Sequence, residues 1–264
     1  MSEIFRCKKD GFCDDPYNQI CKLFVCDTVI GMTGSLTKHI GIVGCSAEGA
    51  ALCYRTICAE GSKILGAHAH PEISMHTPSL HRYVKYLDDG DINGIASLML
   101  SSARLLAAGG ADFLICPDNT IHQAFSIVVE QSPLPWLHIA VSVAENAKDR
   151  GFSKLGLTGT KWLVESSVYP DILASYGIEV LRPDIVERDL TNQIIMDELV
   201  YGVFKPESIA KFQAIITNLK DRGCDAVILG CTEIPLILSD ENSPLPTLDS
   251  TRLLAKAAIN EALK

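Results

Sequence analysis

The sequence predicts an α/β protein built from two similar halves with mainly parallel sheets. Two observations carry this prediction. From residue 39 onward short β-rich segments alternate with helical ones, and a stretch of the first half returns in the second half. Strand–helix alternation is typical of βαβ units, which build parallel sheets. Because such sheets bind ligands at the carboxyl ends of their strands, the turns after the strands are where a site is expected.

The elements follow in chain order from the residue pattern. Strands are expected in eight short apolar runs, at 39–44, 73–76, 112–116, 136–139, 155–158, 179–181, 226–229 and 246–248. Helices are expected in the longer stretches between them, at 48–60, 94–108, 119–129, 141–150, 187–201 and 206–222. Glycines stand where several helices should end, at Gly109-Gly110, Gly151, Gly177 and Gly223.

An internal repeat divides the chain. Residues 110–121 match residues 223–234 at an offset of 113, and Ser-Pro-Leu-Pro follows each copy, at 132–135 and 243–246. The openings 41–44 and 156–159 repeat at a similar spacing. We therefore expect two pseudosymmetric domains that face each other across a cleft. The predicted first domain is 39–139 plus 245–264, the second is 140–244, and 1–38 is an irregular N-terminal extension.

Composition excludes several classes of protein. The chain has 264 residues, of which 47% are hydrophobic and 21% charged, as in an ordinary globular protein. No apolar run reaches the roughly 18 residues of a spanning helix, so we expect no membrane insertion. The net charge of −9 argues against a nucleic-acid partner but leaves room for a small anionic substrate. Ten cysteines without a CxxC pair or a secretory signal indicate reduced thiols and a cytoplasmic protein.

Two residues of the repeat point to chemistry. Cys231 lies in the turn after the 226–229 strand, and the repeat places Asp118 at the equivalent point of the first half. A helix N-terminus at each turn would offer N–H groups to a carboxylate and lower the pKa of a thiol. If the halves face each other, the two side chains approach a ligand from opposite sides. That arrangement suits removal of a proton from one face of a carbon acid and its return on the other.

Several sequence segments resemble the aspartate/glutamate racemase superfamily, and most closely its aspartate and acidic amino acid racemases. The matching segments are 41–48, 54–55, 119–122, 157–160, 187–188, 192–195 and 230–234, of which Gly-Cys-Thr-Glu-Ile at 230–234 is the most specific. The resemblance implies two flavodoxin-like domains with the active site in the cleft between them. It also implies racemisation of a small acidic amino acid without pyridoxal phosphate, and it is compatible with a homodimer.

The chain departs from the family pattern at one position. In the family a thiol precedes Asn-Thr, whereas here the residue before Asn119 is Asp118. Cys116 lies two residues earlier, and the repeat aligns it with Leu229, so we expect it in the core. A carboxyl group of ordinary pKa is a poor proton donor at neutral pH unless burial raises that pKa. Two alternatives to a racemase therefore stay open: a single-thiol decarboxylase or isomerase of a related dicarboxylate, and a ligand-binding member without catalysis.

Further residues are candidates for the site because of their place after strands. Those proposed to bind substrate are Ser46, Arg55, Asn119, Thr120, Thr160, Lys161 and Thr232. Arg55 and Lys161 would supply positive charge, although each is equally well explained as a surface cation. His122 and Glu233 are supporting candidates, since His122 is suited to tuning Asp118 or capping backbone and Glu233 to fixing the turn or orienting Cys231. No dinucleotide or P-loop motif is present, and we expect no cofactor and no metal.

Overall fold

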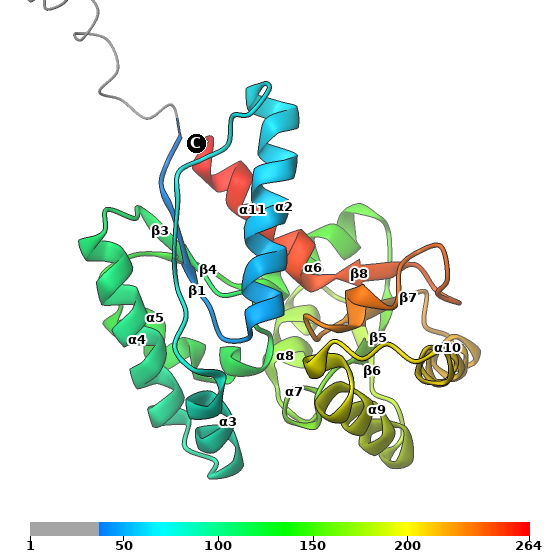
Figure 1. Cartoon of the computed structure of the whole chain (residues 1–264). Coiled ribbons are helices and arrows are strands. Elements are labelled where there is room, and N and C mark those ends of the chain that lie inside the picture. The colour runs from blue at the N-terminus through cyan, green and yellow to red at the C-terminus, as the bar shows by residue number, and fades with distance from the viewer. Residues whose placement is uncertain (1–36) are drawn as a thin grey trace, which may run out of the picture. The chain divides into compact units, whose positions relative to one another are not determined.

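Two four-stranded sheets organise residues 37–264, which are the residues that this computed structural model describes (Figure 1). The first sheet contains β1 (Ile40–Val43), β2 (Ile73–His76), β3 (Phe113–Ile115) and β4 (Trp136–Leu137). The second contains β5 (Lys154–Thr158), β6 (Glu179–Leu181), β7 (Ala226–Leu229) and β8 (Thr247–Asp249). The strand orders are β2-β1-β3-β4 and β6-β5-β7-β8, and every neighbouring pair is parallel.

The identical strand order explains the internal repeat. The repeated segments become β3 and β7, and each Ser-Pro-Leu-Pro stretch leads directly into the fourth strand of its sheet. In register, Leu114 pairs with Trp136 in the first sheet, and Val227 pairs with Thr247 in the second. The predictions of an α/β fold and of parallel sheets are therefore confirmed.

Six helices lie where the sequence predicts them. They are α2 (Ala47–Leu65), α4 (Ile92–Ala108), α5 (Phe125–Gln131), α6 (Ile139–Asp149), α9 (Ile185–Asp197) and α10 (Pro206–Asp221). The structure adds α3 (Leu80–Asp88), α7 (Lys161–Glu165), α8 (Val168–Ser175) and α11 (Ser250–Ala262), which the sequence analysis missed. α7 and α8 have only 5 and 8 residues, too few to display a helical period.

The turns after β3 and β7 differ from the expected α-helix starts. After β3 the chain forms a 3₁₀ helix, η1 (Thr120–Ala124), before α5 begins. After β7 it forms only the three-residue η3 (Ile234–Leu236), with Pro235 in its first turn. Another 3₁₀ segment, η2 (Leu199–Tyr201), follows α9. The expectation that Cys231 lies at the N-terminus of an α-helix is therefore wrong.

The C-terminal segment joins both halves. Strand β8 pairs with β7, so residues 247–249 belong to the second sheet. The sequence-based assignment of 245–264 to the first domain is therefore wrong for these residues. Helix α11 packs against α2 and α6, and its Leu254 and Ile259 share a core cluster with Ile40 and Ile42 of β1. The other proposed domain boundaries remain a prediction. Of the extension proposed for 1–38, residues 1–36 lie outside the part of the chain that the structure describes.

Left-handed glycines follow the helices that precede β3 and β7. Gly110 (φ 89°) and Gly223 (φ 90°) occupy equivalent positions before β3 and β7, and a side chain would be strained at both.

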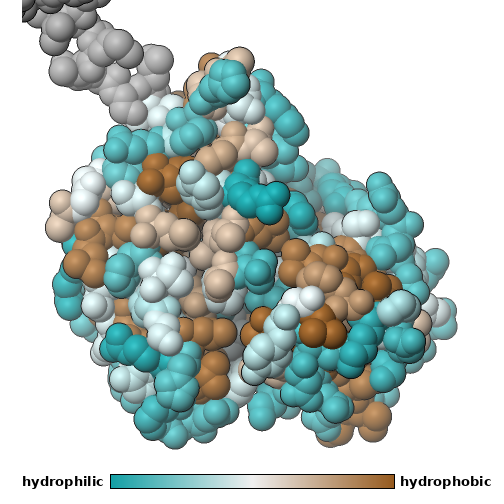
Figure 2. Space-filling view, viewed as in Figure 1, coloured by the Kyte–Doolittle hydropathy of each residue, from teal (hydrophilic) through white to brown (hydrophobic). Residues whose placement is uncertain are grey.

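Figure 2 shows hydrophobic residues interspersed with hydrophilic ones on one face of the molecule. Among the described residues, none of the helices is both long and apolar enough to cross a membrane.

Candidate active site

A pocket lies at the carboxyl ends of the central strands and is lined from both halves of the chain. Its empty space is about 540 Å³ when the space open to solvent is included. The polar lining residues all follow a central strand, β1, β3, β5 or β7: Cys45, Ser46, Asp118, Asn119, Thr120, Thr160, Cys231, Thr232 and Glu233. The structure thus brings Cys231 and Asp118, one from each half, to the same pocket.

A chain of hydrogen bonds holds the Cys231 side of the pocket. The Cys231 thiol and the Thr232 hydroxyl both donate to Glu233 Oε2, at 2.8 and 2.7 Å. Ser46 Oγ lies 3.1 Å from Thr232 Oγ1, and because the Thr232 proton already points to Glu233, Ser46 is the donor. The backbone N–H of Gly49 in turn donates to Ser46 Oγ. Glu233 therefore orients Cys231, which is one of the two roles considered for it.

The Asp118 side of the pocket contains a thiol that the sequence analysis did not select. Asp118 Oδ1 accepts the backbone N–H groups of Thr120 and Ile121, at 3.0 and 3.3 Å, which fixes the carboxyl group at the start of η1. The same carboxyl group is hydrogen-bonded to the Cys45 thiol. Each half thus contributes one thiol and one carboxyl group in contact. Cys45 lies in the turn after β1, separated from the strand only by Gly44, and this place after a strand was the signal that could have identified it.

Burial changes the proton affinity of these groups. It raises the pKa of Asp118 to about 6, with the nearby Glu233 adding to the rise and the hydrogen bonds from Cys45, Ile121 and Thr120 opposing it. Burial and then Glu233 raise the pKa of the Cys231 thiol well above its ordinary value. The structure therefore contradicts the expectation of a lowered thiol pKa: Cys231 is buried, its partner is a carboxyl group, and no α-helix begins there to oppose these effects.

Hydroxyl pairs bridge the two halves at the pocket. Ser46, after β1, meets Thr232, after β7. Thr160, after β5, meets Thr120, after β3, with 3.1 Å between the hydroxyl oxygens. Ser46 and Thr160 are also N-caps, of α2 and α7. These four predicted substrate-binding residues all line the pocket, and each has a hydroxyl partner from the other half.

Asn119 and His122 are engaged in bracing the fold. The Asn119 amide donates to Ser250 Oγ at 2.9 Å and accepts from the Tyr169 hydroxyl at 2.6 Å. His122 Nε2 accepts the Ile139 N–H, so Nδ1 carries the proton and donates to the Asp118 carbonyl oxygen. Burial lowers the pKa of His122 well below its ordinary value, so the ring is neutral. Of the two roles considered for His122, the structure shows the capping of backbone.

Arg55, Lys161 and Cys116 are not part of the pocket lining. Arg55 is exposed on α2. Lys161 is exposed at the start of α7, where its ammonium group lies 5.2 Å from the centre of the Trp162 ring. Cys116 is fully buried in the core of the first half, as the alignment with Leu229 predicted.

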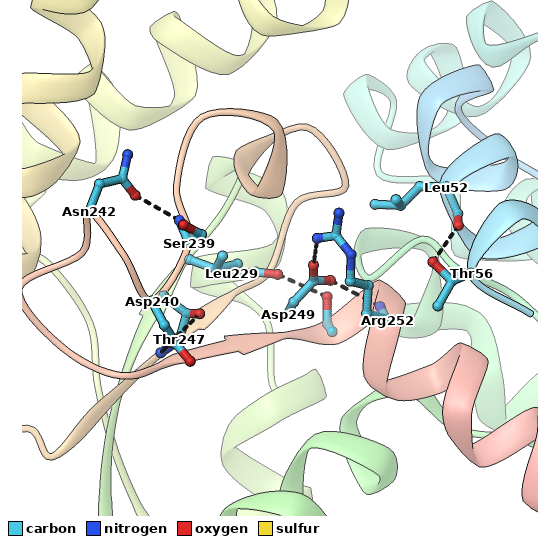
Figure 3. Close-up of polar contacts among 10 residues, drawn as sticks. Leu52, Thr56, Leu229, Ser239, Asp240, Asn242, Thr247, Asp249 and Arg252 are labelled. Atoms are coloured by element: carbon cyan, nitrogen blue, oxygen red, sulfur yellow. Dashed lines mark hydrogen bonds and ion pairs between the residues drawn. The ribbon is translucent and has the colours of Figure 1, made fainter. Parts of the chain in front are cut away.

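Asp249, at the end of β8, serves helix α11 rather than this pocket (Figure 3). Its carboxyl group accepts the Arg252 backbone N–H at 3.0 Å and pairs with the Arg252 guanidinium. The following Ser250 donates to the Leu229 carbonyl oxygen, which ties α11 to the end of β7. Within residues 37–264, no group of three or more metal-ligating side chains is assembled.

Substitution of Gly49 is expected to disturb the contact between the halves. A Cβ atom at Gly49 would lie 2.4 Å from Thr232 Cγ2 and 2.8 Å from Thr232 Cβ, and Thr232 is held by Glu233 and Ser46. Gly49→Ala should therefore destabilise the protein by about 1–3 kcal/mol, although the helix propensity of alanine offsets up to about 1 kcal/mol of this. Thermal melts test this. Gly109→Ala, whose Cβ would meet nothing closer than 3.4 Å, is the control and should change stability less. Equal melting temperatures for the two variants would contradict the close contact.

Comparison with known proteins identifies the chain. The family model described as Asp/Glu/Hydantoin racemase matches residues 40–258, which is most of the sequence. This chain belongs to the Asp/Glu/Hydantoin racemase family. It is therefore an enzyme of the racemase class, and the resemblance noted from its motifs is confirmed.

Solved and curated relatives agree with this placement. The racemase is 31% identical to a Yersinia pestis protein assigned as an Asp/Glu racemase, with a TM-score of 0.79 over 86% of this chain and 100% of that one. An aspartate racemase homologue from Pyrococcus horikoshii is 26% identical, with a TM-score of 0.75 over the same shares. The broad-specificity amino-acid racemase RacX of Bacillus subtilis is 25% identical over 178 residues, 66% of this racemase and 74% of RacX.

Proposed function

We propose that the protein is an amino acid racemase that works by proton transfer at Cα, with Cys231 and Asp118 acting on opposite faces of the substrate. The observation that carries the proposal is that these two side chains, one from each half, line a single pocket. A thiol and a carboxyl group can each take a proton from the substrate Cα or return one to it, and neither needs a cofactor for this. We infer that catalysis proceeds without pyridoxal phosphate, as the motifs imply.

The protonation states support a single cycle. Above about pH 6 Asp118 is ionised, while the raised pKa of Cys231 keeps its thiol protonated. Asp118 then takes the Cα proton of one enantiomer and Cys231 donates its proton to the other face. The opposite enantiomer needs protonated Asp118 and the Cys231 thiolate. In both states the two groups together carry one proton, so each direction of the reaction prepares the pair for the reverse direction. Of the paired hydroxyls of Thr120 and Thr160, only one donates to the other, so the second is available to donate to a substrate carboxylate oxygen as negative charge develops on it.

The partners of the two groups act as positioning residues. Glu233 accepts the Cys231 proton in a hydrogen bond, which holds the sulfur in one rotamer. Cys45 performs the corresponding task for Asp118, and its hydrogen bond favours the ionised carboxylate. Cys45 is 3% exposed, whereas Asp118 is half-buried at the pocket, so Asp118 is the group that is open to a substrate.

The role of Cys45 predicts a shift in the pH profile. Racemisation should decline below about pH 6, because protonated Asp118 leaves the enzyme without a base. Cys45→Ala removes a hydrogen bond that lowers the pKa of Asp118, so the acidic limb of the kcat/KM profile should move to higher pH. Cys45→Ser keeps a donor and should leave the limb close to that of the wild type. If the alanine variant shows no shift, Cys45 does not tune Asp118.

Racemisation of an amino acid by the purified protein tests the proposed function. Single enantiomers are incubated with the full chain, without added pyridoxal phosphate, and the products are separated by chiral chromatography. The panel covers acidic, polar and apolar amino acids. The expected result is conversion of at least one amino acid to its enantiomer until the two are equal. Failure of the folded protein to racemise any of them would overturn the proposal.

A further inference from the structure

The outer part of the pocket is built from apolar side chains. Three of them come from one face of α3, one from α7 and three from the α9–η2 region: Leu80, Val84, Leu87, Trp162, Ile195, Met196 and Val200. All except Ile195 are only half-buried, so their apolar surface faces the empty space of the pocket. An apolar substituent that filled this space would remove that surface from water, which is favourable.

The charge of the pocket is of one sign. Two carboxyl groups, Asp118 and Glu233, lie in its polar part, and within residues 37–264 its lining contains no lysine, arginine or histidine. Their nearness is apparent in the pKa of Asp118, which Glu233 raises. The α-carboxylate of an amino acid already brings a third carboxyl group into this partly buried space, and a side-chain carboxylate would bring a fourth. A buried charge of this kind needs a positively charged partner, which the described lining of the pocket does not supply.

We propose that the substrate is a carbon acid with an uncharged, apolar side chain, which lies against the wall formed by α3, Trp162 and Met196. This proposal rests on the proposed racemase activity and replaces the acidic amino acid expected from the sequence. The Cα atom and its carboxylate lie between Cys231 and Asp118, and the side chain points to the apolar wall.

The test compares kcat/KM for the two classes of side chain. L-leucine, L-methionine and L-phenylalanine are measured against L-aspartate and L-glutamate, and the corresponding 5-substituted hydantoins form a separate arm. We expect at least one apolar substrate to exceed both acidic ones by about tenfold or more. The hydantoin arm shows whether the free amino acid or its ring form carries the side chain. Preference for aspartate or glutamate would overturn this inference while leaving the racemase intact, whereas no turnover of any amino acid would overturn the proposed function.

A specificity switch tests the wall itself. Met196→Lys places an ammonium group on the apolar side of the pocket, so the ratio of kcat/KM for glutamate to that for leucine should rise by about tenfold or more. Val203→Lys is the matched control, because Val203 is 41% exposed and lies outside the pocket lining. It should leave the ratio unchanged. Equal ratios in the two variants, with both proteins folded by circular dichroism, would contradict the placement of the substrate side chain against this wall.

Discussion

Replacement of Cys231 by alanine is expected to reduce racemisation by about 10²–10⁴-fold, the usual contribution of a positioned acid–base group. The thiol has direct access to the pocket, and its partner Glu233 fixes its direction. Because two enantiomers are equally stable, kcat/KM must fall equally in both directions. Chiral chromatography of reactions started from each enantiomer measures this.

Two controls separate chemistry from structure in that experiment. Cys58→Ala removes a half-buried thiol of α2 outside the pocket lining and should retain activity. Cys231→Ser keeps a donor to Glu233 and therefore the local hydrogen bond, but its hydroxyl is a far weaker acid than a thiol. The serine variant should melt like the wild type and still be inactive. Full activity in either Cys231 variant would refute the role of the thiol.

Asp118→Asn is expected to cause the second large loss of racemisation, again about 10²–10⁴-fold. The asparagine oxygen still accepts the N–H groups of Thr120 and Ile121, so the turn before η1 is preserved. The amide cannot take up or release the proton at neutral pH. Retained turnover would instead favour single-thiol chemistry in which Asp118 only binds or positions the substrate.

The same variant has a signature in stability. The pKa of Asp118 is about 6 in the folded protein and 3.8 for an ordinary aspartate, so folding favours the protonated form. The stabilising contribution of Asp118 is therefore lost as the pH rises from below 3.8 through about 6, and Asp118→Asn lacks this contribution and its loss. The melting temperature of the variant relative to wild type should be higher at pH 8 than at pH 4. A constant difference would argue that the carboxyl group is not buried as described.

The strands and their arrangement were predictable because they depend on local pattern and on the repeat. Apolar runs such as that of β7 are visible in the sequence, and the two Ser-Pro-Leu-Pro stretches mark equivalent points of the two sheets. The predicted domain boundary at residue 245 placed the β8 segment with the first domain, although β8 pairs with β7. The Ser-Pro-Leu-Pro stretches before β4 and β8 do indicate that β8 is the fourth strand of the second sheet. α7 and α8 were missed because they are too short to display a period.

The site was predictable in part. Cys231 and Asp118 were found because a strand end fixes where the following residue lies. Cys45 also lies after a strand, but the internal repeat does not single it out, and its contact with Asp118 joins residues 73 positions apart. The amide of Asn119 was expected to bind substrate, but it is occupied by Tyr169 and Ser250, whose approach depends on the packing of α8 and α11. The apolar wall likewise depends on where α3 lies.

Exchange of the Cα proton with solvent deuterium, measured separately for each enantiomer in the two single variants, tests the central claim most directly. If Cys231 and Asp118 face opposite sides of Cα, Cys231→Ala should still exchange the enantiomer whose hydrogen faces Asp118. Asp118→Asn should exchange only the other enantiomer, and this exchange should increase toward alkaline pH because Cys231 must first ionise to act as the base. Mass spectrometry and proton NMR of the recovered substrate measure both reactions. Loss of exchange with the same enantiomer in both variants would contradict the two-sided mechanism.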